Sequence, residues 1–416
     1  MERTYERTAA LVVRAAGPLA SHLGPFVTSL IDQQYAASVI YIKARHALAF
    51  DRWLAKHRIV LADLAEVHIE RCQRRRRRGL WRIRTETRRR ECCEVTQLLQ
   101  YLRSHGLCPA ACIETTAADD LAALYGQYLQ DQQGLATSTI ERYRTVARQF
   151  LHERFGRGAV DLSLLRAGDV IAFVQCQTQS LQPPALKCVA NALRSFLRYA
   201  QYRGEATSAL AAAVPIVAAW TTTPTVPKAI SSEHAQRAID SCDLTTGGGL
   251  RDRAVLLLLA RLGLRAHEII ALHLEDCDWD SGALRVRSKS GREQLLPMPA
   301  DVGAAIAAYL QKGRPMSKDR HLFLRSVAPI RGLMPGSDAI GTIVRYALQR
   351  AQVDAPHRGS HQFRHALAVR MLQGGASLNE IGEVLRHQSP QTTSIYARVD
   401  ISALRSLALP WPGGVR

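Results

Sequence analysis

The chain has 416 residues, 47% of them hydrophobic and 22% charged, which is typical of an ordinary folded protein too long for one compact core. Lysine and arginine number 55 against 36 acidic residues, a formal net charge of +19 that indicates a polyanionic partner and favours nucleic acid over anionic lipid. No apolar run is long enough to span a bilayer, and nine cysteines without paired C-x-x-C spacing predict neither a disulfide framework nor a structural zinc site.

Most of the chain has the three- and four-residue hydrophobic spacing of amphipathic helices. This pattern repeats before residue 219. Ala37–Phe50 aligns with Thr137–Phe150 at an offset of 100, and Leu99–Gly106 aligns with Leu197–Gly204 at an offset of 98. We interpret the repeat as two helical modules of about 100 residues each. The alternative is a chance likeness between amphipathic helices.

An arginine-rich block lies in the first module. Residues 71–90 contain eleven arginines and one acid, Glu86, so the block carries +10. Leu80, Trp81 and Ile83 interrupt it, which favours a folded or DNA-ordered element over a solvated charge run. The planar fork of arginine donates two parallel hydrogen bonds to phosphate, so we expect backbone binding without base reading. The residues assigned to DNA binding are Arg74, Arg75, Arg76, Arg77, Arg78, Arg88, Arg89 and Arg90.

Residues 219–230 predict an interdomain linker, because Thr221–Pro227 is rich in β-branched residues and proline and does not favour a helix. Ser231 then offers an N-cap, with Glu233 in the first turn, for a new domain.

One hairpin interrupts the helical pattern that follows. The sequence predicts a strand over Ala283–Arg287, a glycine-containing turn over Ser288–Arg292 and a strand over Glu293–Met298. Lys289 lies in the turn. A lysine there can reach over a bound substrate and deliver a proton; taken alone, a solvated turn lysine is the simpler interpretation.

Two helix starts in the last third can hold an anion. Gly263 ends an apolar helix and Arg265 opens the next, where Glu268 can orient the arginine side chain. Farther on, His361 and Arg364 are three residues apart and share one face of a first helical turn. Free N–H groups together with these donors predict an anion cradle.

A helix break and a tyrosine follow. Gln388–Pro390 ends a helix just after His387, and the next helix carries Tyr396. Taken singly, His387 is a capped helix end and Tyr396 a packed aromatic residue.

In this order and spacing the residues resemble the tyrosine recombinase (phage integrase) family. Its pattern is an arginine, a hairpin lysine, His-x-x-Arg, then Leu-Gly-His and a tyrosine nine residues after that histidine. The matching residues are Arg265, Lys289, His361, Arg364, His387 and Tyr396. The resemblance covers residues 228–400. One departure is Arg386, which stands where the family has glycine.

The resemblance implies a mainly α fold, with one or two helical SAM-like core-binding modules before a mixed α/β catalytic domain that contains a small antiparallel sheet. The expected divisions are an arginine-rich DNA-binding module at 1–112 that duplicates the core-binding domain, the core-binding domain at 113–218, the linker at 219–230, and the catalytic domain with its C-terminal tail at 231–416.

The resemblance also implies a reaction. Tyr396 attacks a DNA phosphodiester, displaces the 5′-oxygen and forms a 3′-phosphotyrosine, which a 5′-hydroxyl later reverses. Lys289 is then the general acid, His361 assists proton transfer at the tyrosine, and His387 binds a phosphate oxygen. The two arginines neutralise the transition state, supported by Glu268. Neither ATP, a cofactor nor a metal is expected.

The implied partner is double-stranded DNA, bound by a homotetramer that works alone or beside companion recombinases. The chain's ending is similar to recombinases of transposable elements, so we expect a site-specific recombinase that moves or resolves a mobile genetic element. We expect it in the cytoplasm, associated with the nucleoid and away from membranes. Two arrangements stay open for the tail 401–416, docking into a neighbour or packing on its own domain.

Two other functions share these residues. A type IB topoisomerase uses a similar set to relax supercoils as a monomer, although the spacing of His387 and Tyr396 and the core-binding module favour a recombinase. A catalytically silent DNA-binding regulator could keep the same fold, although the complete residue set argues against it.

Overall fold

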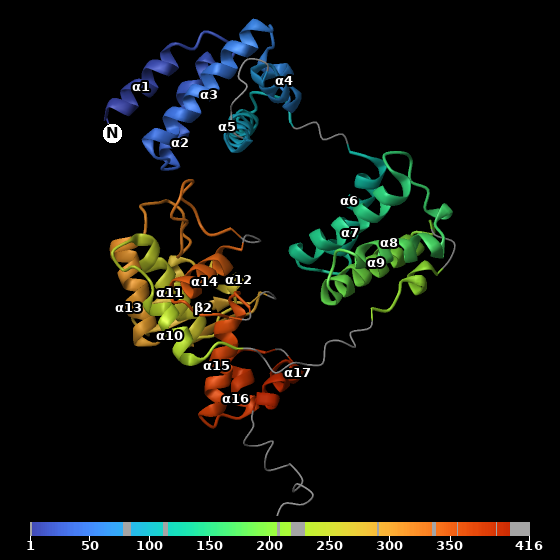
Figure 1. Cartoon of the computed structure of the whole chain (residues 1–416), viewed down its shortest axis with the longest axis vertical. Helices are drawn as coiled ribbons and strands as arrows, with labels where there is room; N and C mark the ends of the chain where they lie inside the picture. The colour runs from blue at the N-terminus through green and yellow to red at the C-terminus, as the bar shows by residue number, and fades with distance from the viewer. Residues whose placement is uncertain are drawn as a thin grey trace, which may run out of the picture. The chain divides into compact units, whose positions relative to one another are not determined.

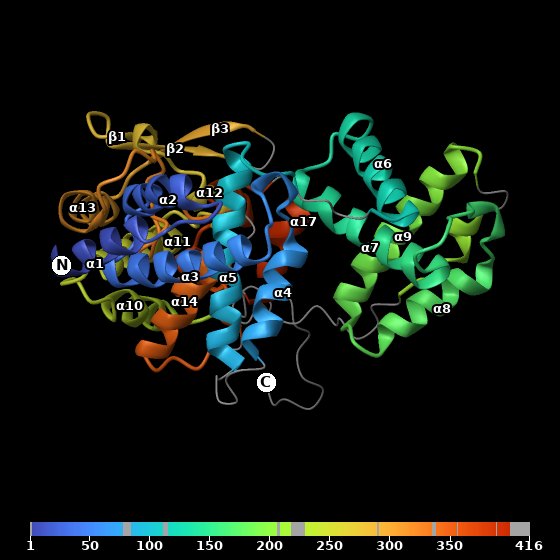
Figure 2. The ribbon, with the colours of Figure 1, turned by 90° about the horizontal axis from the view of Figure 1, so that it is seen from above.

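The fold is that of a computed structural model of the chain (Figures 1 and 2). It describes residues 2–77, 85–110, 115–205, 209–217, 229–288, 291–334, 338–355, 357–387 and 389–399. Among these, the side chains of residues 2, 73–77, 85–93 and 398–399 are not described. Residues 219–228 of the expected linker, Arg78, Lys289 and the tail 401–416 lie outside the described residues.

The predicted fold class is confirmed: the described residues are mainly helical, with one three-stranded antiparallel sheet. Contacts within the chain define two compact units, one of Met1–Ile113 with Ile230–Leu367 and one of Glu114–Ala229 with Ala368–Arg416. Each is described by itself below. No helix among the described residues is both long and apolar enough to cross a membrane.

The first module, residues 2–110, packs amphipathic helices around a buried core that includes Phe26, Phe50 and Leu99. Its elements are α1 (Glu2–Val13), α2 (Ala20–Asp32), α3 (Ala37–Lys56), the short 3₁₀ turn η1 (Leu61–Asp63), α4 (Glu66–Arg77) and α5 (Thr85–Ser104). The arginine block falls at the end of α4, in residues 78–84 outside the described chain, and at the start of α5.

The second module, residues 115–217, has an aromatic core in which Phe150 meets both Phe173 and Phe196 edge-on. A capping box between Thr116 and Asp119 starts its first helix. Its elements are α6 (Ala117–Asp131), α7 (Thr137–Phe155), η2 (Leu162–Leu164), α8 (Ala167–Thr178), α9 (Pro183–Tyr202) and η3 (Leu210–Ala213). Figure 1 shows α6 to α9 as one bundle.

The two modules share an order of elements. Helices α2 and α3, the turn η1 and helices α4 and α5 correspond in order and similar length to α6, α7, η2, α8 and α9, with starts ~100 residues apart. The last helix of each set is followed by a glycine with positive φ, 68° at Gly106 and 73° at Gly204. The aligned Phe50 and Phe150 are both buried.

The sheet-containing part, residues 229–367, is built around α11 (Gly247–Arg261). Val255–Leu259 of this helix are almost fully buried, as expected for a helical stretch that is apolar on every face. The N-cap predicted at Ser231 is confirmed, since its side chain accepts a hydrogen bond from the backbone N–H of His234. The other helical elements here are α10 (Ser232–Asp240), α12 (Ala266–Ile270), η4 (Leu274–Asp276), α13 (Ala300–Ala308), η5 (Tyr309–Gly313) and α14 (Ala339–Arg350).

Three strands run along one edge of this part, as Figure 2 shows. They are β1 (Cys277–Asp278), β2 (Ala283–Arg287) and β3 (Glu293–Pro297), in the order β1-β2-β3 and all antiparallel. The predicted hairpin is therefore present. Ala283 pairs with Pro297 at its far end and Arg287 with Glu293 beside the turn, so the turn starts and ends on a matched pair.

Helix α15 (His361–Gln373) leads from this part into a C-terminal helical segment. That segment contains α16 (Leu378–Val384), α17 (Pro390–Thr393) and the 3₁₀ turn η6 (Ser394–Val399). Ser377 caps α16 through a capping box with Glu380.

Candidate active site

A sharp turn after α11 positions Arg265. Gly263 has a φ of 57°, a left-handed conformation that glycine adopts without strain, and Arg265 is the N-cap of α12. The backbone N–H of Arg265 donates to Glu268 Oε2 at 2.8 Å, and its Nη1 donates to Glu268 Oε1 at 2.9 Å. The Glu268 side chain is 1% exposed and that of Arg265 is 28% exposed. A buried carboxylate thus holds a guanidinium that partly faces solvent.

Helix α15 brings two further site residues to this turn. Arg364 is buried, and its Nη1 donates to the backbone oxygen of Gly263. His361 lies one helical turn earlier. Burial, followed by the nearby charges of Arg364 and Arg265, lowers the pKa of His361 below its ordinary value. The structure therefore brings Arg265, Glu268, His361 and Arg364 together in one unit, with a histidine that favours its neutral, proton-accepting form.

The C-terminal helical segment positions His387. Helix α16 ends in a Schellman motif, in which the N–H of His387 donates to Gly382 O and the N–H of Arg386 donates to Glu383 O, both at 2.9 Å. Arg386 occupies the left-handed position of that motif, with a φ of 55°. The departure from glycine noted in the sequence therefore keeps the turn and places a strained arginine directly before His387.

The ring of His387 has a partner that the sequence did not indicate. Its Nδ1 lies 2.7 Å from Oγ1 of Thr393, the last residue of α17. Tyr396 follows on η6 and is 1% exposed. His387, Thr393 and Tyr396 thus belong to one short segment, whose proline break was predicted from the sequence. No periodic pattern could have singled out Thr393.

Some expected site residues lie outside the part of the chain whose side chains are described. Lys289 lies outside the described residues, although both strands that flank its turn are described. Arg78 is also outside them. The remaining arginines assigned to DNA binding lie on α4 and α5, where only the backbone is described.

Comparison with known proteins identifies the family. Residues 228–402 match the phage integrase family. Over 406 residues the chain is 45% identical to the putative integrase/recombinase y4rA of Sinorhizobium fredii, which covers 95% of each protein. It is 30% identical to tyrosine recombinase XerD of Mycobacterium tuberculosis, over 70% of this chain and 95% of XerD.

Solved structures agree on the fold. The XerH recombinase bound to palindromic difH substrate, in a post-cleavage complex, superposes with a TM-score of 0.54 at 18% identity, over 69% of this chain and 83% of XerH. A lambda integrase dimer bound to a COC′ core site gives a TM-score of 0.50 at 16% identity, over 67% and 94%. The family match and the sequence relatives support the recombinase interpretation over the topoisomerase and the silent regulator. The chain belongs to the phage integrase family of tyrosine recombinases, which are DNA strand-exchange enzymes.

Proposed function

We propose that this recombinase is site-specific and cleaves and rejoins DNA through a 3′-phosphotyrosyl intermediate formed by Tyr396. The observation that carries the proposal is the convergence of Arg265 and Arg364 on His361, close enough for both charges to lower the histidine pKa. Two arginines around one neutral imidazole suit a site that binds a phosphodiester and accepts a proton.

The two arginines act on charge. A phosphorane-like transition state gathers negative charge on its equatorial oxygens, and donors fixed in advance stabilise it. Glu268 holds one guanidinium and the Gly263 carbonyl binds the other, so neither has to reorganise during the reaction. Donors fixed in this way are commonly worth about 3–4 kcal/mol each.

The remaining groups move or hold protons. His361 takes part in proton transfer from the Tyr396 hydroxyl as the tyrosine oxygen attacks phosphorus. Lys289 gives a proton to the 5′-oxygen as the bond between phosphorus and that oxygen breaks. His387, held by Thr393, donates a hydrogen bond to a phosphate oxygen. The bond energy stays in the phosphotyrosine, so ligation by a 5′-hydroxyl needs no ATP.

A nicked suicide substrate tests the nucleophile. The scissile strand then loses its short 5′-hydroxyl fragment, so the covalent complex accumulates and is seen as a band of reduced mobility in denaturing gels. We expect the complex to form without ATP and in the presence of a chelator. Tyr396→Phe should abolish it while DNA binding persists. A Tyr396→Phe variant that still cleaved would refute the assignment.

Strand exchange distinguishes recombination from relaxation. Two duplexes that carry the target site should yield a Holliday junction, whereas a topoisomerase would only relax supercoiled plasmid as a monomer. Relaxation without any junction would contradict the proposal.

We infer that double-stranded DNA is held by both helical modules and the catalytic domain. The family match over 228–402 supports a catalytic domain at 231–416, and the common order of α2–α5 and α6–α9 supports a duplicated core-binding module, at 1–112 and 113–218. Residues 219–230 link the last two. The arginine block, Arg74–Arg78 with Arg88–Arg90, binds phosphates. Footprinting should show protection that shrinks at one end when residues 1–112 are removed.

Strand exchange on two duplexes requires four active sites, so we propose a homotetramer on DNA, assembled alone or with companion recombinases. We also propose that the recombinase serves the transposition of a mobile genetic element and that it acts in the cytoplasm, at the nucleoid. Native mass spectrometry on a junction substrate measures the number of protomers. Footprinting on the ends of the element that carries this gene would locate the target.

A further inference from the structure

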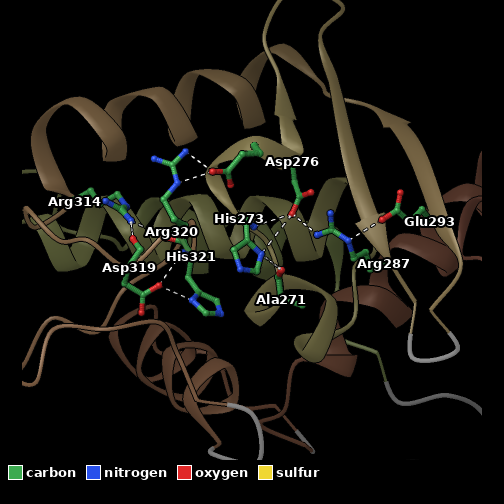
Figure 3. A network of polar contacts seen from close by, with 10 residues as sticks. Ala271, His273, Asp276, Arg287, Glu293, Arg314, Asp319, Arg320 and His321 are labelled. Carbon is green, nitrogen blue, oxygen red and sulfur yellow. Dashed lines mark hydrogen bonds and ion pairs between the residues drawn. The ribbon is translucent and has the colours of Figure 1, made fainter.

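Arg287, the last residue of β2, binds two carboxylates at once (Figure 3). Its Nη1 donates to Oδ2 of Asp276 at 2.9 Å, and its Nε donates to Oε1 of Glu293 at 2.9 Å. Figure 3 shows the guanidinium between the two acidic side chains. The planar fork of arginine suits this arrangement, because it presents several donors in fixed directions.

The two carboxylates have different surroundings. The Asp276 side chain is 1% exposed, ends η4, and accepts a second hydrogen bond from the backbone N–H of His273 at 2.8 Å. Glu293 begins β3, pairs with Arg287 in the sheet register, and has a side chain that is 53% exposed. Arg287 therefore ties both strands of the hairpin, at their turn end, to an anchor buried in this part of the protein.

The turn that joins β2 and β3 is short. The N–H of Ser288 donates to Arg292 O at 2.9 Å, and the N–H of Gly291 donates to Ser288 O at 3.0 Å. Between Ser288 and Gly291 the sequence holds two residues, Lys289 and Ser290. Lys289 is thus only two residues from Arg287 along the chain.

We propose that Arg287 is a positioning residue for Lys289, which it aims by fixing the base of the hairpin to Asp276. This rests on the proposed function only in taking Lys289 as the general acid. A general acid must come within about 2.6–3.2 Å of the atom it protonates. A misplacement of about 1 Å can lower a rate ~100-fold. Asp276 and Glu293 act through Arg287, and none of the three needs to touch DNA.

The chemistry of the leaving group offers a direct test. In the normal substrate the ammonium of Lys289 gives its proton to the 5′-oxygen as the P–O bond breaks, and a neutral amine remains. If sulfur replaces that bridging oxygen, the leaving thiolate needs no proton, because a thiol is a much stronger acid than an alcohol. A defect in delivering the proton should therefore vanish on the sulfur substrate, and a defect in phosphate binding or folding should not.

The experiment measures single-turnover cleavage of both substrates by the full chain at saturating DNA. We expect Arg287→Met to slow cleavage of the oxygen substrate about 10- to 100-fold and to cleave the sulfur substrate at the wild-type rate. Arg287→Lys keeps the positive charge but lacks the planar guanidinium. It should cleave the oxygen substrate at a rate between those of Arg287→Met and the wild type. Arg320→Met is the matched control, because Arg320 pairs with Glu275, next to Asp276, on the exposed side of η4. It should change neither rate.

Equal slowing on both substrates, or no slowing on either, would overturn the proposal. Glu293→Gln covers the case in which Arg287→Met fails to fold, since Glu293 is largely exposed. Glu293→Gln should slow cleavage of the oxygen substrate less than Arg287→Met does, and should leave cleavage of the sulfur substrate unchanged. Equal slowing on both substrates, or none on either, would again count against the positioning role of Arg287. Lys289→Met tests the assumption that Lys289 is the general acid. If this variant does not cleave the sulfur substrate at the wild-type rate, Lys289 is not the general acid and the proposed function is at fault.

Discussion

Thr393 holds the ring of His387 through a contact of 2.7 Å between the threonine Oγ1 and the histidine Nδ1. The threonine is 3% exposed, and Gly382 makes room for it, since a Cβ at that glycine would lie 3.1 Å from the same hydroxyl. We assign the proposed hydrogen bond to a phosphate oxygen to Nε2, the other ring nitrogen.

We predict that Thr393→Val slows single-turnover cleavage about 10- to 100-fold without weakening DNA binding, because valine keeps the shape of threonine and removes the hydroxyl that orients the ring. Thr393→Ser keeps the hydroxyl and should stay close to wild type. A valine variant that cleaves at the wild-type rate would show that the ring needs no such partner.

The left-handed backbone at Arg386 predicts a gain in local stability on substitution. A side chain costs roughly 1–2 kcal/mol in this conformation, so Arg386→Gly should raise the opening free energy of α16 amides by about 1 kcal/mol in hydrogen exchange. The matched control is Gln352→Gly, at a φ of 52° after α14, which should stabilise its own helix end without affecting cleavage. If Arg386 contributes to the phosphate site, only Arg386→Gly also weakens DNA binding.

Local signals accounted for much of the fold. The hairpin was predictable because a glycine-containing turn separates two short runs of strand residues, and β2 and β3 begin where expected. The contact of Arg265 with Glu268 was also predictable from the sequence, since the two are three residues apart on one helix start. The strand β1 was not predictable, because a strand of two residues shows no alternating pattern. Arg364 with Gly263, and Arg287 with Asp276, are tertiary pairs that no pattern along the chain can reveal.

The surroundings of His361 predict its titration. Burial and then the charges of Arg364 and Arg265 disfavour the imidazolium, so the ring should titrate below its ordinary value of 6.5 in the free enzyme. The unfolded chain then binds the proton more readily. The contribution of neutral His361 to stability is therefore complete above pH 6.5, the ordinary pKa of the ring in the unfolded chain. It is lost as the pH falls from 6.5 through the lower pKa of the folded protein. NMR titration of the ring measures the midpoint. Arg364→Gln should move it upward, and a midpoint at or above 6.5 in the wild type would contradict this account.

A buried polar pair distinguishes the two helical modules. In the first, His46 Nδ1 contacts Glu94 Oε2, and both residues are buried. At the same offsets of 100 and 98, the second module has the apolar residues Val146 and Ala192, which are also buried. An apolar pair is thus compatible with this architecture.

We predict that His46→Leu or Glu94→Leu alone lowers the unfolding free energy of the first module by about 1–3 kcal/mol, since each removes one member of a buried polar contact. The double variant should be less destabilised than either single one, because it removes both polar groups at similar volume. Urea denaturation of all four proteins gives the coupling energy. Additive losses would mean that the two side chains act independently.

The arginine block predicts how DNA binding depends on salt. Each phosphate contact contributes about 0.9 to the slope of log affinity against log salt, so replacing Arg74–Arg78 with glutamine should flatten that slope and weaken binding equally on target and unrelated DNA. Replacement with lysine is the matched control, because it keeps the charge and should keep most of the slope while losing the bidentate fork. Filter binding over a range of salt concentrations measures both. A loss confined to one DNA sequence would mean that these arginines read bases, contrary to the proposed backbone role.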